Sequence, residues 1–209
     1  GTRPEIIKLS RVMVKLDQFC DHTIVHTGQN YDYELNQIFF EDLGIRKPDR
    51  FLGAAGGTSS ETIGKIIIAV DQMLAEVSPE ALLVLGDTNS CLSVIPAKRR
   101  KIPIFHMEAG NRCFDQNVPE EINRRLASVV ADFHFAPTDR ARTNLLREGV
   151  LPGSVFITGN TIVDALRSIR VEGDFENKAL HAVPFQHHRV LLVTAHRREN
   201  HGAPLASIC

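Results

Sequence analysis

Short apolar runs alternating with amphipathic stretches are the feature of this chain that most restricts its fold. The apolar runs predict buried strands, at residues 22–26, 81–85, 103–107, 133–136, 155–157 and 189–194. The stretches between them predict helices, at residues 5–16, 31–43, 58–76, 92–99, 119–130, 138–148 and 161–169. Strands separated by helices favour parallel pairing with right-handed crossovers, so we expect an α/β fold with a Rossmann-like, doubly wound parallel sheet.

A change in composition near Val171 predicts the domain organisation. Residues 1–170 carry the alternating pattern and predict an N-terminal Rossmann-like domain. Residues 171–188 are polar and lack clear periodicity, which indicates a linker. Residues 189–209 open with a new buried strand, so we expect the start of a second, truncated nucleotide-binding domain there.

The first eight residues predict an anion-binding turn. Gly1 and Arg3 precede Pro4, which suits the first turn of a helix, and Lys8 lies one turn further on. Free backbone N–H groups at a helix start, together with two cations, favour a phosphate. Such a turn normally follows a buried strand, so we expect this domain to lack its first strand in the given sequence.

Composition and charge exclude several classes of protein. The chain has 209 residues, is 43% hydrophobic and has a formal net charge of -1, which argues against a general nucleic-acid binder. No apolar run is long enough to span a membrane, and no signal peptide is visible. The four cysteines lack CxxC spacing. We therefore expect a cytoplasmic protein with reduced thiols and with no nucleic-acid or membrane partner.

Candidate functional residues follow from the predicted sheet, because ligands of open parallel sheets bind beyond the carboxyl ends of the strands. The polar residues at such positions are Arg3, Gln29, Asp87, Glu108, Glu120, Glu121, Asn160 and His196. Carboxylates converging on one crevice with Arg3 and His196 would suit proton transfer beside a bound phosphate.

Each carboxylate also has a structural interpretation. Asp87 could cap the helix that follows it. Glu108 could accept a hydrogen bond from Arg112 or Arg124. The pair at 120–121 lies in the first turn of a predicted helix, where acidic side chains complement the helix dipole, and Arg124 could pair with the first of them.

Other site types are not expected. His181, His187 and His188 have no acidic or cysteine partner at a useful spacing, so no metal site is predicted. No dinucleotide fingerprint, P-loop or hydrolase motif is present. The residues alone therefore indicate a nucleotide- or phosphate-binding α/β enzyme with a carboxylate-rich crevice between two domains.

Six motifs in order along the chain resemble those of the non-hydrolysing UDP-N-acetylglucosamine 2-epimerases. They are GTRPE at 1–5, GDT at 86–88, HMEAG at 106–110, PEEINR at 119–124, TGNT at 158–161 and HRREN at 196–200. This family has a GT-B-like architecture of two Rossmann-type domains. Its members invert C2 of the sugar by eliminating UDP to a glycal and adding it back, with no metal or nicotinamide cofactor.

The resemblance implies a role for each candidate residue. Asp87, Glu108 and Glu120 would carry the acid–base chemistry, and His196 would join them as a catalytic residue. The resemblance also implies contacts to phosphates or support of the carboxylates from a group of polar residues: Arg3, Lys8, Arg124, Gln29, Asn160 and Arg197. The implied partner is a UDP-sugar, and a homodimer is expected for the full-length protein.

The resemblance leaves the substrate open. Residues 111–116 are similar to the branch acting on UDP-2-acetamido-deoxyhexoses such as the fucosamine precursor, whereas residues 155–166 are similar to the commonest branch, which converts UDP-GlcNAc to UDP-ManNAc. Of the two glutamines associated with a regulatory second-substrate site in some bacterial members, residues 29–32 keep only the first, Gln29. A GT-B glycosyltransferase and a non-catalytic nucleotide-sugar-binding module are the alternatives from other classes.

Overall fold

The computed structural model describes residues 2–28, 40–169 and 178–191, and the chain divides into two compact units, Gly1–Ile169 and Arg170–Cys209. The helices are α1 (Arg3–Phe19), α3 (Ser59–Val77), α4 (Val94–Arg99), α5 (Pro119–Val130), α6 (Asp139–Arg147), α7 (Ile162–Ser168) and α8 (Lys178–His181), with 3₁₀ turns η1 (Asn89–Ser93) and η2 (Pro152–Ser154). The strands are β1 (Val25–His26), β2 (Arg50–Phe51), β3 (Leu82–Leu85), β4 (Ile104–Met107), β5 (Phe133–Ala136) and β6 (Val155–Ile157).

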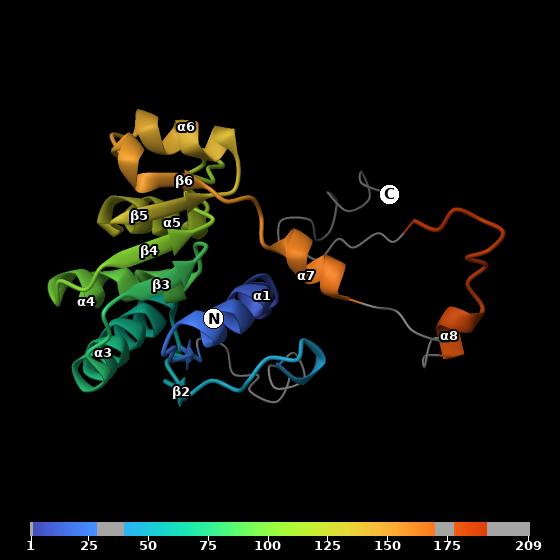
Figure 1. Cartoon of the computed structure of the whole chain (residues 1–209), viewed down its shortest axis with the longest axis horizontal. Coiled ribbons are helices and arrows are strands. Elements are labelled where there is room, and N and C mark those ends of the chain that lie inside the picture. Colours follow the sequence, from blue (N-terminus) through green and yellow to red (C-terminus); the bar gives the residue numbers. More distant parts are fainter. Residues whose placement is uncertain (1, 29–39, 170–177, 192–209) are drawn as a thin grey trace. The chain divides into compact units, whose positions relative to one another are not determined.

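The described strands of the first unit all pair in parallel, as predicted. β3, β4, β5 and β6 form one sheet in chain order, and β1 pairs with β2 in a second, smaller sheet (Figure 1). Leu85 of β3 lies opposite Met107 of β4, so both strands end at the same edge of the sheet. The residues that follow them, from Gly86 and from Glu108, therefore emerge side by side.

Helix α3 illustrates how the sequence builds this unit. Thr58 caps its start by accepting a hydrogen bond from the backbone N–H of Glu61 (3.1 Å). Buried side chains recur at helical spacing along α3, and Ser78 ends the helix in the left-handed conformation. The buried face packs against β3, α4 and β4 in one core cluster, which includes Ile66, Val70, Met73, Leu74, Val84, Val94 and Ile104.

Several predicted elements differ from those observed. The strand predicted at 22–26 is reduced to Val25–His26, because the backbone of Ile24 is engaged by Asp49 through both its N–H and its carbonyl. The helix predicted at 92–99 begins earlier, as η1, because Cys91 N–H bonds to the carbonyl of Thr88 (2.9 Å) and tightens the turn. β2 was not predicted, since a strand of only two residues, Arg50 and Phe51, is too short to give a periodic signal.

Some of the elements predicted from the sequence differ from the structure or lie outside the described residues. One helical turn, α8, lies within the predicted linker at 171–188. Residues 189–191 of the strand predicted at 189–194 are not in a strand, because no described segment pairs with them, and residues 192–194 lie outside the described residues. Most of the helix predicted at 31–43 also lies outside them, although residues 40–42 are helical.

Gly110 is the position where the fold most needs a glycine. Its φ is +86°, and a Cβ there would lie 2.2 Å from the carbonyl oxygen of Ala141 in α6. Its own carbonyl accepts a hydrogen bond from Asn144 Nδ2 (2.9 Å), which fixes the loop after Glu108 against α6. The close approach is therefore part of what holds this edge of the sheet.

We expect Gly110→Ala to lower the free energy of unfolding by about 3 kcal/mol or more, because it adds a backbone clash to the cost of a left-handed alanine. Gly149→Ala is the matched control, since φ there is +89° with nothing within 4 Å of the added Cβ. That variant should lose only about 1–2 kcal/mol. Urea unfolding measures both, and equal losses would contradict the role of the Ala141 contact.

Candidate active site

The turn after β3 presents Asp87 at the carboxyl edge of the sheet. Gly86, with φ +73°, allows the chain to turn, and Thr88 Oγ1 donates a hydrogen bond to Glu5 Oε1 (2.6 Å) in the first turn of α1. The interpretation of Asp87 as a helix cap is wrong, because Thr88 occupies the cap position of η1. The carboxylate of Asp87 instead pairs with Arg124 Nη2 at 2.6 Å.

Glu108 follows β4 and adopts a left-handed backbone conformation, with φ +57°. Its carboxylate oxygens lie 2.7 and 2.9 Å from Lys8 Nζ, and its side chain is 11% exposed. The expected structural partners, Arg112 and Arg124, bind elsewhere: Arg112 is held by Glu148 and Ser128. A non-glycine residue in this conformation is strained, and such strain concentrates at functional positions.

Helix α5 supplies the remaining charges. Pro119 opens the helix, as predicted, and the adjacent residues Glu120 and Glu121 point in different directions: Glu120 is exposed, whereas Glu121 is fully buried. Among the described residues, the ion pairs of Arg124 go to Asp87 and Glu121 rather than to Glu120.

Glu121 is more deeply buried and more extensively hydrogen-bonded than the role in a helix dipole predicted for it requires. Burial raises its pKa, but hydrogen bonds from Cys113 and Arg125 and the charge of Arg124 lower that pKa to about 2. The available signal was spacing, because residues at i+3 and i+4 from Glu121 are both arginines and share one helix face.

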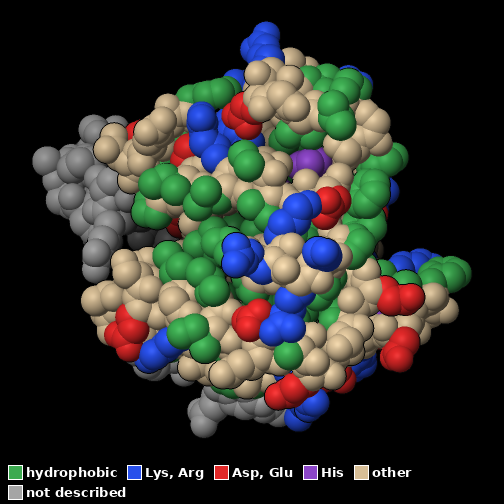
Figure 2. Space-filling model, turned by 90° about the vertical axis from the view of Figure 1, so that its left-hand side faces the viewer, with side chains coloured by type: hydrophobic (Ala, Val, Ile, Leu, Met, Phe, Trp, Pro, Cys, Tyr) green, Lys and Arg blue, Asp and Glu red, His purple; other side chains and the backbone are tan. Residues whose placement is uncertain are grey.

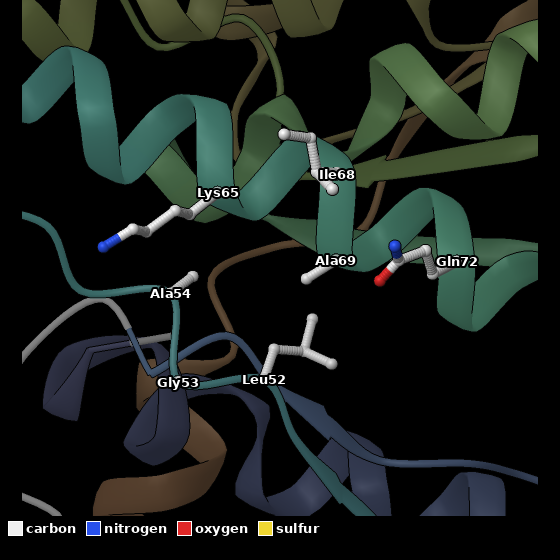
Figure 3. Close-up of a pocket in the computed structure, with 7 residues that line it drawn as sticks. All are labelled: Leu52, Gly53, Ala54, Lys65, Ile68, Ala69 and Gln72. Carbon is white, nitrogen blue, oxygen red and sulfur yellow. The ribbon is translucent and has the colours of Figure 1, made fainter.

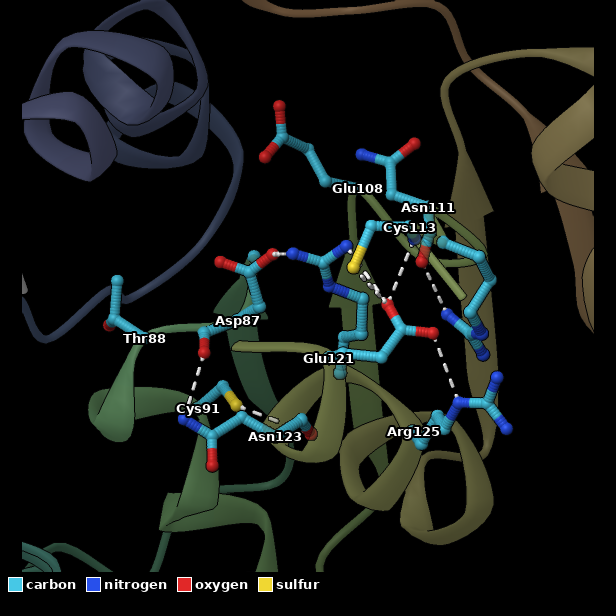
Figure 4. A network of polar contacts seen from close by, with 12 residues as sticks. Asp87, Thr88, Cys91, Glu108, Asn111, Cys113, Glu121, Asn123 and Arg125 are labelled. Atoms are coloured by element: carbon cyan, nitrogen blue, oxygen red, sulfur yellow. Dashed lines mark hydrogen bonds and ion pairs between the residues drawn. The ribbon is translucent and has the colours of Figure 1, made fainter. Parts of the chain in front are cut away.

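The carboxylates of Asp87, Glu108 and Glu120 interact electrostatically. Burial raises the pKa of Asp87, the positive charge of Arg124 opposes this, and the negative charges of Glu108 and Glu120 add to the rise. Asp87, Glu108 and Glu120 therefore belong to one electrostatic neighbourhood, with Lys8 and Arg124 as its cations. Figure 4 shows Asp87 and Glu108 near the same sheet edge.

The other predicted residues lie around this neighbourhood or outside the described residues. Arg3 is exposed at the start of α1. Asn160 is exposed after β6, where its Oδ1 accepts a hydrogen bond from Ile162 N–H (3.2 Å), so it also shapes its own turn. Gln29, His196 and Arg197 lie outside the described residues.

Two further features of the described chain lie apart from these charges. A pocket between α3 and the segment after β2 is lined by Leu52, Gly53, Ala54, Lys65, Ile68, Ala69 and Gln72, and no carboxylate lines it (Figure 3). On the face shown in Figure 2, basic, acidic and hydrophobic side chains are interspersed rather than segregated.

The described ranges contain no group of three or more His, Cys, Asp or Glu side chains placed to hold a metal ion. Within the same ranges, no helix has the length and apolar character needed to cross a membrane.

His106 joins the sheet to the Asp87 turn. Its Nε2 lies 2.8 Å from the carbonyl of Gly86, so Nε2 carries the proton of a neutral ring. Burial lowers its pKa to about 4, the hydrogen bond to Gly86 opposes this, and charge at His134 and Arg112 adds to the lowering. Burial likewise lowers the pKa of His26 to about 4.

These histidines predict loss of stability in mild acid. Each pKa lies near 4 in the folded chain and near 6.5 when unfolded, so the unfolded chain binds more protons between these values. The contribution of each neutral histidine to the free energy of unfolding should be fully present above pH 6.5. Between pH 6.5 and pH 4, the free energy of unfolding should fall by up to about 1.4 kcal/mol per pH unit for each histidine.

Urea unfolding at several pH values measures this slope. His106→Gln should flatten it, while His187→Gln, a change at an exposed position, controls for the mere loss of a histidine. An unchanged slope in His106→Gln would contradict the assignment of a buried neutral ring.

Comparisons with known proteins identify the family. The family model for UDP-N-acetylglucosamine 2-epimerase matches residues 13–209. A UDP-N-acetylglucosamine 2-epimerase from Methanocaldococcus jannaschii is 42% identical over 204 residues, covering 96% of this chain and 56% of the relative. A UDP-2,3-diacetamido-2,3-dideoxy-D-glucuronate 2-epimerase from Pseudomonas aeruginosa is 43% identical over 152 residues, covering 71% of this chain and 43% of the relative.

A solved structure agrees with these relatives. The Methanocaldococcus jannaschii UDP-GlcNAc 2-epimerase in complex with UDP-GlcNAc and UDP superimposes with a TM-score of 0.76 at 44% identity, covering 79% of this chain and 46% of that one. The chain spans about half the length of the curated relatives it matches. The predicted class, an α/β Rossmann-like half of a GT-B-like epimerase, is confirmed. The chain belongs to the UDP-N-acetylglucosamine 2-epimerase family.

Proposed function

We propose that the full-length protein interconverts UDP-GlcNAc and UDP-ManNAc by a non-hydrolysing route. A base removes the C2 proton, the C1–oxygen bond to UDP breaks, and a 2-acetamidoglycal forms. Readdition places a proton on the other face of C2 while a UDP oxygen bonds to C1 again. Family membership and the UDP-GlcNAc complex of a relative support this substrate.

The observation that carries the proposal is the cluster of Asp87, Glu108 and Glu120 beside two cations. The C2–H bond is weakly acidic, so the reaction needs a positioned base on one face and an acid on the other. Carboxylates gathered without chemical need would weaken the binding of a diphosphate. We assign the proton transfers to these three groups and to His196.

The cations have a second task in the proposed reaction. UDP leaves with a growing negative charge, which Arg3 and Arg197 would stabilise. Lys8 and Arg124 would interact both with the carboxylates and with the phosphates. Gln29 and Asn160 would contact the substrate as neutral donors. A linker at 171–188 and the start of a second nucleotide-binding domain from residue 189 are part of the same proposal.

Two alternatives can be separated by the substrate that turns over. The branch acting on UDP-2-acetamido-deoxyhexoses is favoured by residues 111–116, and a relative acts on a diacetamido sugar. A glycosyltransferase would need an acceptor, so conversion of a UDP-sugar without one supports epimerisation. The homodimer and the cytoplasmic location remain predictions.

We expect Glu108→Gln in the full-length protein to lower epimerisation by about 10²–10⁴-fold, the usual contribution of a positioned acid or base. UDP binding should change little, because the amide keeps the shape of the side chain. The assay is conversion of UDP-GlcNAc to UDP-ManNAc, with UDP affinity from calorimetry.

The matched control is Glu61→Gln, which removes a carboxylate paired with Lys65 (2.8 Å) on the surface of α3. It should keep wild-type turnover. Activity of Glu108→Gln within a few-fold of the control would contradict the catalytic assignment.

Arg3→Ala should weaken binding of the UDP-sugar more than Asp87→Asn does. A charge-assisted hydrogen bond to phosphate contributes about 1.5–3 kcal/mol, so affinity should fall roughly tenfold or more. Calorimetric titration of both variants measures the difference. Equal affinities of wild type and Arg3→Ala would refute the phosphate role of the first turn of α1.

A further inference from the structure

Glu121 is fully buried, and both of its carboxylate oxygens accept hydrogen bonds (Figure 4). Its Oε2 accepts from the N–H of Cys113 (3.0 Å), from Cys113 Sγ (3.3 Å) and from Arg124 Nη1 (3.2 Å). Its Oε1 accepts from Arg125 Nε (3.1 Å). One side chain thus joins α5 to the loop that follows Glu108.

The guanidinium of Arg124 connects Glu121 to the candidate active site. One nitrogen binds Glu121 and the other binds Asp87 at 2.6 Å, and the side chain is only 15% exposed. Its Nε is buried and has no hydrogen-bond partner within the described chain. The orientation of the guanidinium therefore depends on the two carboxylates that it bridges.

Helix α5 also holds the backbone of the same turn. Asn123 Nδ2 donates to the carbonyl of Asp87 (3.0 Å) and to Asn89 Oδ1 (3.2 Å). The backbone of Asp87 is consequently fixed without help from Glu121. What Glu121 adds is control of the side chain of Asp87, through Arg124.

A purely structural role does not account well for the burial of Glu121. Complementing the helix dipole requires no burial, and the neighbouring Glu120 lies exposed in the same helical turn. Burying a carboxylate is costly, and an apolar side chain of similar size would avoid that cost. A fully buried carboxylate that reaches Asp87 through a single shared guanidinium fits an orienting role.

We propose that Glu121 is a positioning residue that holds Arg124 in the orientation that directs the Asp87 carboxylate at the reacting sugar. The part that concerns the sugar rests on the proposed function. The part that concerns Asp87 stands on the contacts alone.

The consequence for Asp87 follows from the groups around it. They are Arg124 and Glu120 from α5, Glu108 after β4 with Lys8 of α1 paired to it, and Cys91 from η1. Arg124 is the group that lowers the pKa of Asp87, while burial and the two glutamates raise it. When Glu121 no longer holds Arg124, the pKa of Asp87 should rise further.

The experiment compares Glu121→Gln with Glu148→Gln in the full-length protein. Glu148 is a matched control, because it pairs with the buried guanidinium of Arg112 in the same loop but does not touch Arg124. Carbon-13 NMR of aspartate-labelled protein, with the Asp87 signal assigned from Asp87→Asn, reports the titration of Asp87 directly.

We expect the titration of Asp87 to move to higher pH in Glu121→Gln and to stay in place in Glu148→Gln. The kcat for UDP-GlcNAc should fall by about 100-fold, as for a misplaced reacting group, with KM changed less than about threefold. The limb of the pH–rate profile that Asp87→Asn abolishes should shift in the same direction as the NMR titration.

Should Glu121→Gln fail to fold, Glu121→Asp keeps the charge but withdraws the carboxylate from Arg124 by one methylene, and the same readouts should move less but in the same direction. Lower stability with an unchanged Asp87 titration and unchanged kcat would overturn the proposal and leave a structural role. A wild-type protein without epimerase activity would refute the proposed function, while the Asp87 titration would still decide the role of Glu121.

Discussion

Negative charge gathered at one edge of the parallel sheet is the constraint on which the described structure depends. Asp87 and Glu108 follow neighbouring strands in register, so the fold itself brings like charges together. Two cations from different helices compensate them: Lys8 of α1 binds Glu108, and Arg124 of α5 binds Asp87. These ion pairs also tie both helices to the sheet edge, so the arrangement that balances charge organises the candidate site.

Much of the fold could be predicted because local patterns and tertiary structure agree. The bounds of α5, β5 and β6 match the prediction, since each begins or ends at an unambiguous signal such as Pro119. Asp87 and Glu108 could be selected because strand ends in a parallel sheet define a ligand edge. Their partners could not, because an ion pair between Lys8 and Glu108 joins residues far apart in the sequence. Glu120 and Glu121 could both be listed as candidates, but the burial of Glu121 could not be predicted, because adjacent buried and exposed glutamates look alike in sequence.

Backbone strain and buried polar groups also help to fix the geometry of this edge of the sheet. Glu108 is held at positive φ between β4 and Gly110, which itself fits against α6 only without a side chain. His106 is buried and holds the turn at Gly86 through a hydrogen bond to the Gly86 carbonyl (2.8 Å). Such features cost stability, which is expected where geometry serves chemistry rather than packing.

In the proposed reaction, this carboxylate cluster moves a proton at C2 of a UDP-sugar. Proton NMR of UDP-GlcNAc incubated with the full-length protein in deuterated buffer tests it most directly. We expect the C2 proton signal to disappear as UDP-ManNAc forms, with deuterium in its place and no net loss of the UDP-sugar. An unchanged spectrum, or formation of the epimer with its C2 proton retained, would contradict it.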